Sequence, residues 1–240
     1  MGARSEADVG VKARAEWVAR TLEQAYGRPE WKRRADPLDE LILTVLSQNT
    51  SDVNSGRAFA SLKSRFPTWE SAAQASVEEL EDTIRPAGLA PQKAPRILAM
   101  LREINAREGS YSLDRLERMP TSDVIEYLTS LHGVGLKTAA CVLMFSLGRP
   151  VMPVDTHVHR TALRLGLVPR GTSPDKAHHI LQGLFEEEQI YPVHINMIRH
   201  GREVCTARSP KCGACPLSSG CPTAAEMSFT GQIGPAPQQR

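Results

Sequence analysis

Residues 131–160 read LHGVGLKTAACVLMFSLGRPVMPVDTHVHR and begin with a glycine-kinked turn that leads into an apolar helix. The preceding segment, Ser122–Ser130, also has helical periodicity, so the pattern predicts a helix, a tight hairpin and a second helix. Gly133 and Gly135 can adopt positive φ and let another backbone approach closely. The unpaired N–H groups at the start of the second helix would then form a phosphate site.

Two side chains of this stretch can carry chemistry. Lys137 falls in the first turn after the hairpin, and Asp155 opens a predicted helix, Thr156–Leu167, after a proline-bounded connection. A lysine amine attacks only when neutral, and burial beside the positive end of a helix disfavours the ammonium form, so we expect Lys137 to be partly shielded. The alternatives are a phosphate-binding lysine and an aspartate that only caps its helix. The pair indicates chemistry on nucleic acid.

Composition limits the other classes. The 240 residues are 41% hydrophobic and 23% charged, which is ordinary for a globular protein with a sizeable core, and the net charge of +2 alone indicates no polyanionic partner. No apolar run reaches the roughly 20 residues of a membrane span, and the N-terminus lacks a secretory signal. We therefore expect no membrane association and an intracellular, reducing location in which disulfides are rare. Nothing indicates an obligate oligomer, so we expect a monomer.

The rest of the chain is helical in pattern, and we find no convincing strand, which predicts an all-α fold of stacked short helices. Ser51 or Asp52 can cap one helix, and Ser76 to Glu79 form a capping box for another. The break GRPVMP, Gly148–Pro153, is the strongest internal boundary. Other expected helices are Val11–Tyr26, Leu38–Ser47, Gln92–Arg107, one from Ser173 to about Glu188, and Val193–Val204.

Four of the five cysteines follow the spacing C-x6-C-x2-C-x5-C, namely Cys205, Cys212, Cys215 and Cys221. Four thiolates so close in the chain can surround one metal centre. The irregular spacing favours a 4Fe–4S cluster, and a zinc site, which usually shows two C-x2-C pairs, is the alternative. Arg208 and Lys211 lie in the loop between the first two cysteines and are candidates to meet phosphate, unless this is only a solvated charged loop. Cys141, in an apolar run, is expected in the core.

The ordered combination of LSQNTSD (Leu46–Asp52), LHGVGLKTA…VDTHVHR (Leu131–Arg160) and the four cysteines resembles the endonuclease III family of helix-hairpin-helix DNA glycosylases. The resemblance covers about Leu38–Cys221. It implies a two-lobed fold with double-stranded DNA bound between the lobes. The implied parts are a six-helix lobe at 37–149, an iron–sulfur lobe built from 11–36 with 150–225, and flexible tails at 1–10 and 228–240.

The resemblance also implies catalytic roles. Lys137 matches the nucleophile that attacks C1′ of a damaged nucleotide and forms a Schiff base, and Asp155 matches the carboxylate that supports base loss. Related adenine-removing enzymes lack this lysine, so Lys137 favours a bifunctional glycosylase/AP lyase of base excision repair. Its substrates would be oxidised pyrimidines and abasic sites, with the strand cleaved by β-elimination.

The DNA contacts follow from the same comparison. The hairpin residues Gly133, Val134 and Gly135 would grip phosphate without reading bases. Asn49, with Gln48 beside it, aligns with a family glutamine that fills the gap left by the extruded base. Leu89, at the tip of the loop 86–91, would be the apolar wedge, unless it is an ordinary core leucine.

Three positions depart from the family pattern. His132 stands where proline is usual, Asn49 stands where glutamine is usual, and His159 replaces an apolar or aromatic residue. None of these removes a catalytic group. Two other hypotheses stay open: an enzyme of the same fold that acts on a different base or mainly on abasic sites, and a non-catalytic DNA-binding protein stapled by its metal centre.

Overall fold

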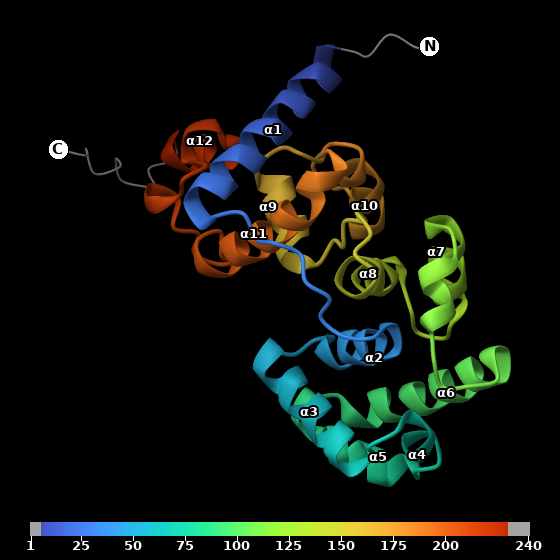
Figure 1. The fold of residues 1–240 in the computed structure, drawn as a ribbon. Helices are drawn as coiled ribbons and strands as arrows, with labels where there is room; N and C mark the ends of the chain where they lie inside the picture. Colours follow the sequence, from blue (N-terminus) through green and yellow to red (C-terminus); the bar gives the residue numbers. More distant parts are fainter. Residues whose placement is uncertain (1–5, 230–240) are drawn as a thin grey trace. The chain divides into compact units, whose positions relative to one another are not determined.

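The computed structural model describes residues 6–229, and all the regular structure within these residues is helical (Figure 1), as the all-α prediction required. The chain forms two compact units. The terminal unit combines the chain up to Trp31 with the chain from Pro150 onward, and the central unit spans Lys32–Arg149. The second junction lies within the break Gly148–Pro153. No helix of the described residues is both long and apolar enough to cross a membrane.

The central unit is a succession of short helices joined by tight turns. Its elements are α2 (Pro37–Ser47), α3 (Asp52–Arg65), α4 (Trp69–Ala73), α5 (Val77–Ile84), η1 (Arg85–Ala87), α6 (Ala90–Glu108), η2 (Asp114–Arg118), α7 (Thr121–Ser130), α8 (Leu136–Cys141) and the π-helical turn η3 (Val142–Ser146). The predicted caps are confirmed. Ser51 Oγ accepts the N–H of Asn54 at 3.3 Å, and Ser76 and Glu79 exchange both capping-box hydrogen bonds, at 3.1 and 3.2 Å.

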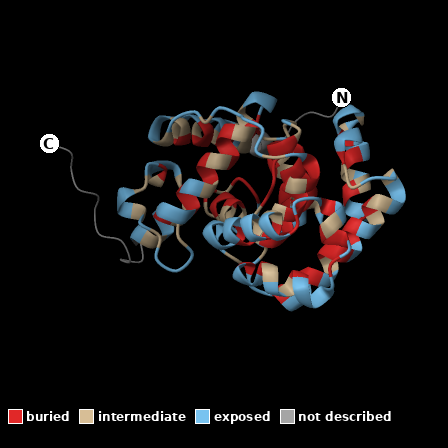
Figure 2. Ribbon diagram, turned by 60° about the horizontal axis from the view of Figure 1, so that its bottom comes forward, coloured by how far each residue is buried: buried red, intermediate tan, exposed pale blue. Residues whose placement is uncertain are grey.

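The core of the central unit forms where α2, α3, α5, α6 and α8 pack on one another. Leu41, Leu46, Leu62, Ile97 and Leu101 are completely or almost completely buried there. Each such side chain stabilises the fold by about 1.5–3 kcal/mol relative to an exposed position. Buried and exposed positions share the same helices (Figure 2), as expected of amphipathic helices around a common core.

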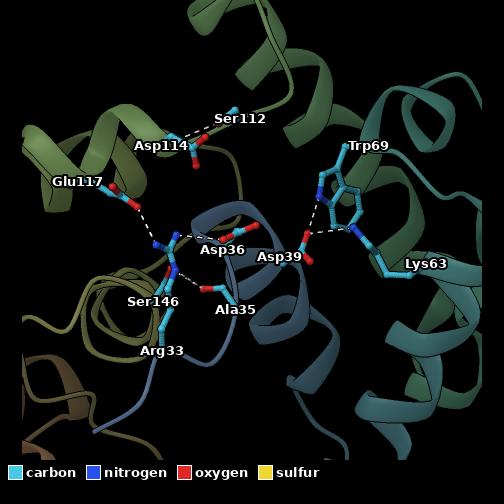
Figure 3. A network of polar contacts seen from close by, with 10 residues as sticks. All are labelled: Arg33, Ala35, Asp36, Asp39, Lys63, Trp69, Ser112, Asp114, Glu117 and Ser146. Carbon is cyan, nitrogen blue, oxygen red and sulfur yellow. Dashed lines mark hydrogen bonds and ion pairs between the residues drawn. The ribbon is translucent and has the colours of Figure 1, made fainter.

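The chain enters the central unit through an arginine pair. The backbone N–H of Arg34 donates to Phe145 O at 3.0 Å, and its guanidinium lies 4.0 Å above the Phe145 ring and pairs with the fully buried Glu40. Arg33 binds Glu117 at 2.9 Å (Figure 3). A buried carboxylate without a partner is energetically costly, so the ion pair with Arg34 allows Glu40 to be buried on α2. These contacts fix the start of α2 against η3.

The terminal unit contains both ends of the described chain. Its elements are α1 (Glu6–Tyr26), α9 (Thr156–Arg164), α10 (Pro174–Gln182), α11 (Glu187–Glu203), η4 (Cys212–Ala214), η5 (Ser218–Gly220) and α12 (Pro222–Phe229). Helix α11 packs on both α1 and α9. The expected tails lie mainly outside the described residues, but α1 already begins at Glu6 and α12 reaches Phe229. Gly10 does not prevent this, because one glycine costs a helix only about 1 kcal/mol.

Besides the start of α1, which lies at Glu6 rather than Val11, three helix boundaries of the sequence prediction were wrong. Helix α9 ends at Arg164 rather than Leu167, because Gly166 adopts φ +64° and the next N–H turns back to Ala162 O at 2.9 Å. Helix α10 ends at Gln182, before Gly183, rather than near Glu188.

Helix α11 begins at Glu187 rather than Val193, behind a capping box in which Gln189 Oε1 accepts the N–H of Glu186 at 3.0 Å. Pro192 therefore lies inside this helix and leaves the carbonyl of Glu188 without its helical donor. Arg28 Nη2 supplies that hydrogen bond at 3.1 Å, which explains how the helix passes through the proline.

Candidate functional site

The hairpin between α7 and α8 has the conformation that its glycines allow. Gly133 adopts φ +80°, and Val134, which is buried, closes the turn by donating to Leu131 O at 3.1 Å. Gly135 is extended at φ −96° and precedes α8, whose first turn has no side-chain cap. The N–H groups that begin α8 therefore have no side-chain cap, as an anion site requires.

Lys137 is half-buried in the first turn of α8, as expected. Cys141 lies one turn further along the same helix and interacts with Lys137. Burial raises the pKa of the Cys141 thiol, and the ammonium group of Lys137 opposes that shift. Cys141 is 4% exposed, which confirms it as a core residue. The amine of Lys137 thus lies at the edge of a packed core, which limits its contact with water.

Asp155 belongs to the terminal unit and caps α9. Its Oδ1 accepts the N–H groups of His157 at 2.9 Å and Val158 at 2.7 Å. Among the described residues, no hydrogen bond reaches the second oxygen, Oδ2, so the cap leaves that oxygen available for chemistry. Capping and a chemical role are therefore compatible in one side chain.

A buried histidine that the sequence analysis did not predict, His178, forms hydrogen bonds to the backbone of the extended segment before Asp155. His178 Nδ1 donates to Met152 O at 2.9 Å, and its Nε2 accepts the N–H of Val154 at 3.2 Å. Since one ring satisfies two backbone groups, the chain reaches Asp155 in a fixed conformation. The position of His178 on the inner face of an amphipathic helix was the only available sequence signal.

The other two histidines near Asp155 have structural partners. Arg160 Nη2 donates to His157 Nδ1 at 3.1 Å, and His159 Nε2 donates to Thr172 O at 2.8 Å. His132, in the hairpin, is exposed.

The predicted DNA-contacting side chains Gln48, Asn49 and Leu89 lie in loops beside α6, and Arg208 and Lys211 lie in the loop before η4 of the terminal unit. Gln48 accepts a hydrogen bond from Arg96 Nη1 at 3.1 Å, and Asn49 beside it is exposed with φ +55°. Leu89 is 44% exposed, so the alternative of a core leucine is wrong. Arg208 and Lys211 are also exposed. The roles of these side chains toward DNA stay predictions.

The four cysteines line one cavity in the terminal unit, together with Arg164, His200 and neighbouring apolar groups. Within residues 6–229, no three His, Cys, Asp or Glu side chains converge as ligands of a single ion would. The thiols instead surround a common space, which fits a multi-iron cluster. Burial raises the pKa of the Cys215 thiol to about 11, so a cluster that binds thiolates must displace protons to form.

Two donors that the sequence did not reveal face the sulfur atoms. Arg164 Nη1 lies 3.3 Å from Cys205 Sγ, and His200 Nε2 lies 3.6 Å from Cys215 Sγ. Tyr26 Oη lies 2.9 Å from His200 Nδ1. A thiolate at Cys215 can only accept a hydrogen bond from Nε2–H, and that tautomer requires the Tyr26 hydroxyl to donate to Nδ1. Such N–H contacts stabilise anionic thiolates and orient the ligands around a cluster.

Comparisons with known proteins agree with this arrangement. The model of the HhH-GPD superfamily of base excision DNA repair proteins matches residues 42–187, and that of the iron–sulfur binding domain of endonuclease III matches residues 205–221. Endonuclease III of Thermotoga maritima is 36% identical over 206 residues, which are 86% of this chain and 91% of that protein. A putative DNA glycosylase of Arabidopsis thaliana is 38% identical over 169 residues, 70% of this chain and 57% of the relative.

Among solved structures, a non-covalent endonuclease III–DNA complex superposes with a TM-score of 0.78 at 27% identity, covering 91% of this chain and 98% of that chain. A thermostable thymine-DNA glycosylase has the same fold, with a TM-score of 0.70 at 19% identity.

A helix-hairpin-helix unit with these matches defines a base excision repair DNA glycosylase. The chain belongs to the HhH-GPD superfamily and, within it, to the endonuclease III family. Its four C-terminal cysteines fall inside the matched iron–sulfur domain, so its cofactor is a 4Fe–4S cluster and the zinc alternative is set aside. The hypothesis of a non-catalytic DNA-binding protein is likewise excluded by the family.

Proposed function

We propose that this glycosylase is bifunctional: it removes oxidised pyrimidines from double-stranded DNA through a Schiff base with Lys137, and then cleaves the strand by β-elimination. The observation that carries the proposal is the position of Lys137, half-buried in the first turn of α8, directly behind an uncapped hairpin. A phosphate held by the hairpin N–H groups would bring a nucleotide sugar toward the amine.

Two comparisons support a covalent reaction. A trapped endonuclease III–DNA covalent intermediate superposes on this chain with a TM-score of 0.78 at 28% identity, covering 90% of this chain and 98% of that chain. A second relative, DNA glycosylase/AP lyase ROS1 of Arabidopsis thaliana, is 32% identical over 170 residues, which are 64% of this chain but 12% of that protein. A covalent intermediate needs a nucleophile, and in this chain Lys137 occupies the helical turn that follows the hairpin.

In the proposed reaction the neutral Nζ of Lys137 attacks C1′ as the glycosidic bond breaks, and the bonding electron pair leaves with the base. Asp155 Oδ2 takes the proton that the attacking nitrogen loses. The sugar ring then opens to give the Schiff base. Transfer of a C2′ proton to water forms the C2′=C3′ bond and expels the 3′ phosphate with the electron pair of the C3′–O bond. A second water then hydrolyses the Schiff base and releases Lys137.

In the proposed complex, one part of the protein binds the DNA backbone and another inserts side chains into the duplex. The hairpin at Gly133–Gly135 holds the DNA backbone without sequence preference. Extruding a nucleotide costs a few kcal/mol, and less where pairing is already damaged. Leu89 would wedge the stack open, while Gln48 and Asn49 would occupy the gap.

A second substrate class is suggested by the plant relatives. Besides ROS1, proteins named DEMETER-like protein 2 and transcriptional activator DEMETER are 32% and 30% identical to this chain, although the chain spans only 13% and 10% of their lengths. Their similarity supports including duplexes with lesions other than oxidised pyrimidines in any test of specificity.

Borohydride trapping on a panel of lesion-bearing duplexes tests the proposal. Wild-type protein should form a covalent adduct with oxidised pyrimidines and abasic sites, and Lys137→Ala should form none. Lys176→Ala, at an exposed lysine of α10, serves as the matched control and should trap like wild type. An undiminished adduct in Lys137→Ala, or no adduct with any lesion, would contradict the proposal.

A further inference from the structure

Lys93 is a buried lysine of α6 that has no catalytic assignment. It is 3% exposed, and its Nζ donates to Leu46 O at 2.8 Å and to Ala87 O at 2.9 Å. These carbonyls end α2 and η1, where helical donors run out. Burial, and secondarily the charge of Arg96, lowers the pKa of Lys93. One side chain therefore closes two helix ends at once.

Both closed helix ends lead directly into strained backbone. Within residues 6–229, Asn49 at φ +55° and Leu89 at φ +52° are the two non-glycine residues with positive φ. Asn49 follows Leu46 by three residues, and Leu89 follows Ala87 by two. Left-handed conformations persist at non-glycine residues only where the surrounding structure holds them, and they gather at functional sites.

Arg96, one turn after Lys93 on α6, extends the same contacts. Its Nη1 binds Gln48 Oε1 at 3.1 Å. Its side chain also lies against the hairpin, because a Cβ added at Gly133 would sit 2.5 Å from Arg96 Cδ. Consecutive turns of one helix thus contact the Gln48–Asn49 loop, the Leu89 loop and the hairpin.

We propose that Lys93 is a positioning residue that fixes the Gln48–Asn49 loop and the Leu89 tip relative to each other, so that both enter the duplex as one body. The inference rests on the proposed function, in which these loops hold the gap around an extruded nucleotide. Opening the stack at Leu89 without filling the gap would let the base return. Because Lys93 is hydrogen-bonded to the start of both loops, Leu89 would not insert into the stack without the Gln48–Asn49 loop.

The experiment compares variants of the full-length, cluster-loaded protein. Lys93→Met removes both N–H donors and keeps most of the aliphatic stem, whereas Ile104→Val, at a fully buried position three turns along α6, is the control for core damage. Affinity is measured for a duplex with a tetrahydrofuran abasic analogue and for the same duplex undamaged. 2-Aminopurine opposite the analogue reports insertion into the stack.

Lys93→Met should lower the preference for the analogue by about tenfold, as loss of both hydrogen bonds would allow, and reduce the 2-aminopurine signal in parallel. Its affinity for undamaged duplex should stay near wild type, because that binding rests on the hairpin. Leu89→Ala should have a similar effect, and the double variant should lose no more than the larger single loss. Arg96→Met, outside the buried clamp, should shift the preference in the same direction.

The proposal is overturned if the Lys93→Met and Leu89→Ala losses multiply, or if Lys93→Met matches Ile104→Val. Lys93→Met could instead lose affinity equally for the analogue duplex and the undamaged duplex, with a lowered thermal midpoint, which marks a general folding defect. That result, together with an unchanged preference in Arg96→Met, would also overturn the proposal. The proposed function fails separately: wild-type protein would then show neither preference for the analogue nor a trapped adduct. A wild type that shows both, with Lys93→Met unaffected, refutes only the positioning role.

Discussion

Asp155 offers the sharpest test of the mechanism, because one side chain has a structural and a proposed chemical role. Its Oδ1 accepts two N–H groups at 2.9 and 2.7 Å at the start of α9. Asp155→Asn keeps an oxygen that can accept these bonds but loses the carboxylate, whereas Asp155→Ala loses both. The two variants therefore separate the cap from the proton acceptor.

The expected stability losses follow from these contacts. Removing an N-cap acceptor costs about 0.5–2 kcal/mol, and removing a negative charge at a helix N-terminus costs about 0.3–1 kcal/mol. Asp155→Ala should lose both contributions, and Asp155→Asn only the second. A missing proton acceptor should slow base removal by about 10²–10⁴-fold in both variants.

The assay pairs single-turnover base release with thermal unfolding of cluster-loaded protein. Ser173→Ala is the matched control, because Ser173 caps α10 in the same unit by accepting the N–H of Lys176. It should lose stability without losing activity. Near-wild-type turnover in Asp155→Asn would refute the chemical role, and an unchanged thermal midpoint in Asp155→Ala would refute the cap.

Three other predictions concern the cluster, the hairpin and acid stability. Cys215→Ser should lose the visible absorbance of the cluster and bound iron, and a retained full complement of iron would contradict the ligand assignment. Gly133→Ala should weaken DNA binding far more than Gly135→Ala. Gly133 has φ +80° and a crowded Cβ position, whereas Gly135 has φ −96° and open space around its Cβ position. Equal DNA binding by the two variants would count against the hairpin geometry. The guanidinium of Arg115 lowers the pKa of Glu108 in the folded protein. The Glu108 carboxylate therefore stabilises the fold fully above its unfolded pKa of about 4.3, and this stabilisation is lost as the pH falls through the lower folded pKa. Glu108→Gln should flatten the fall of the thermal midpoint with acid, and an unchanged pH profile would argue against the pair.

Local signals explain what the sequence predicted about the helices. Ser51, Ser76 and Glu79 act within one helical turn, so their capping is written in neighbouring residues. The sequence prediction started this helix at Val193, although Glu186 and Gln189 carry a capping signal that starts α11 at Glu187. A remote donor, Arg28, decides that the helix continues through Pro192.

The order of motifs by itself determined the fold class, the family, the enzyme class and the cofactor, since hairpin glycines and clustered cysteines act at short sequence separation. Only the tertiary structure revealed Lys93, His178 and His200, whose partners lie on other elements of their units. A buried polar group must form hydrogen bonds, and its partners can come from any element that packs against it. The sequence spacing of these partners does not predict that they will meet. For the same reason the clamp on the Asn49 and Leu89 loops became visible only when α2, η1 and α6 were packed together.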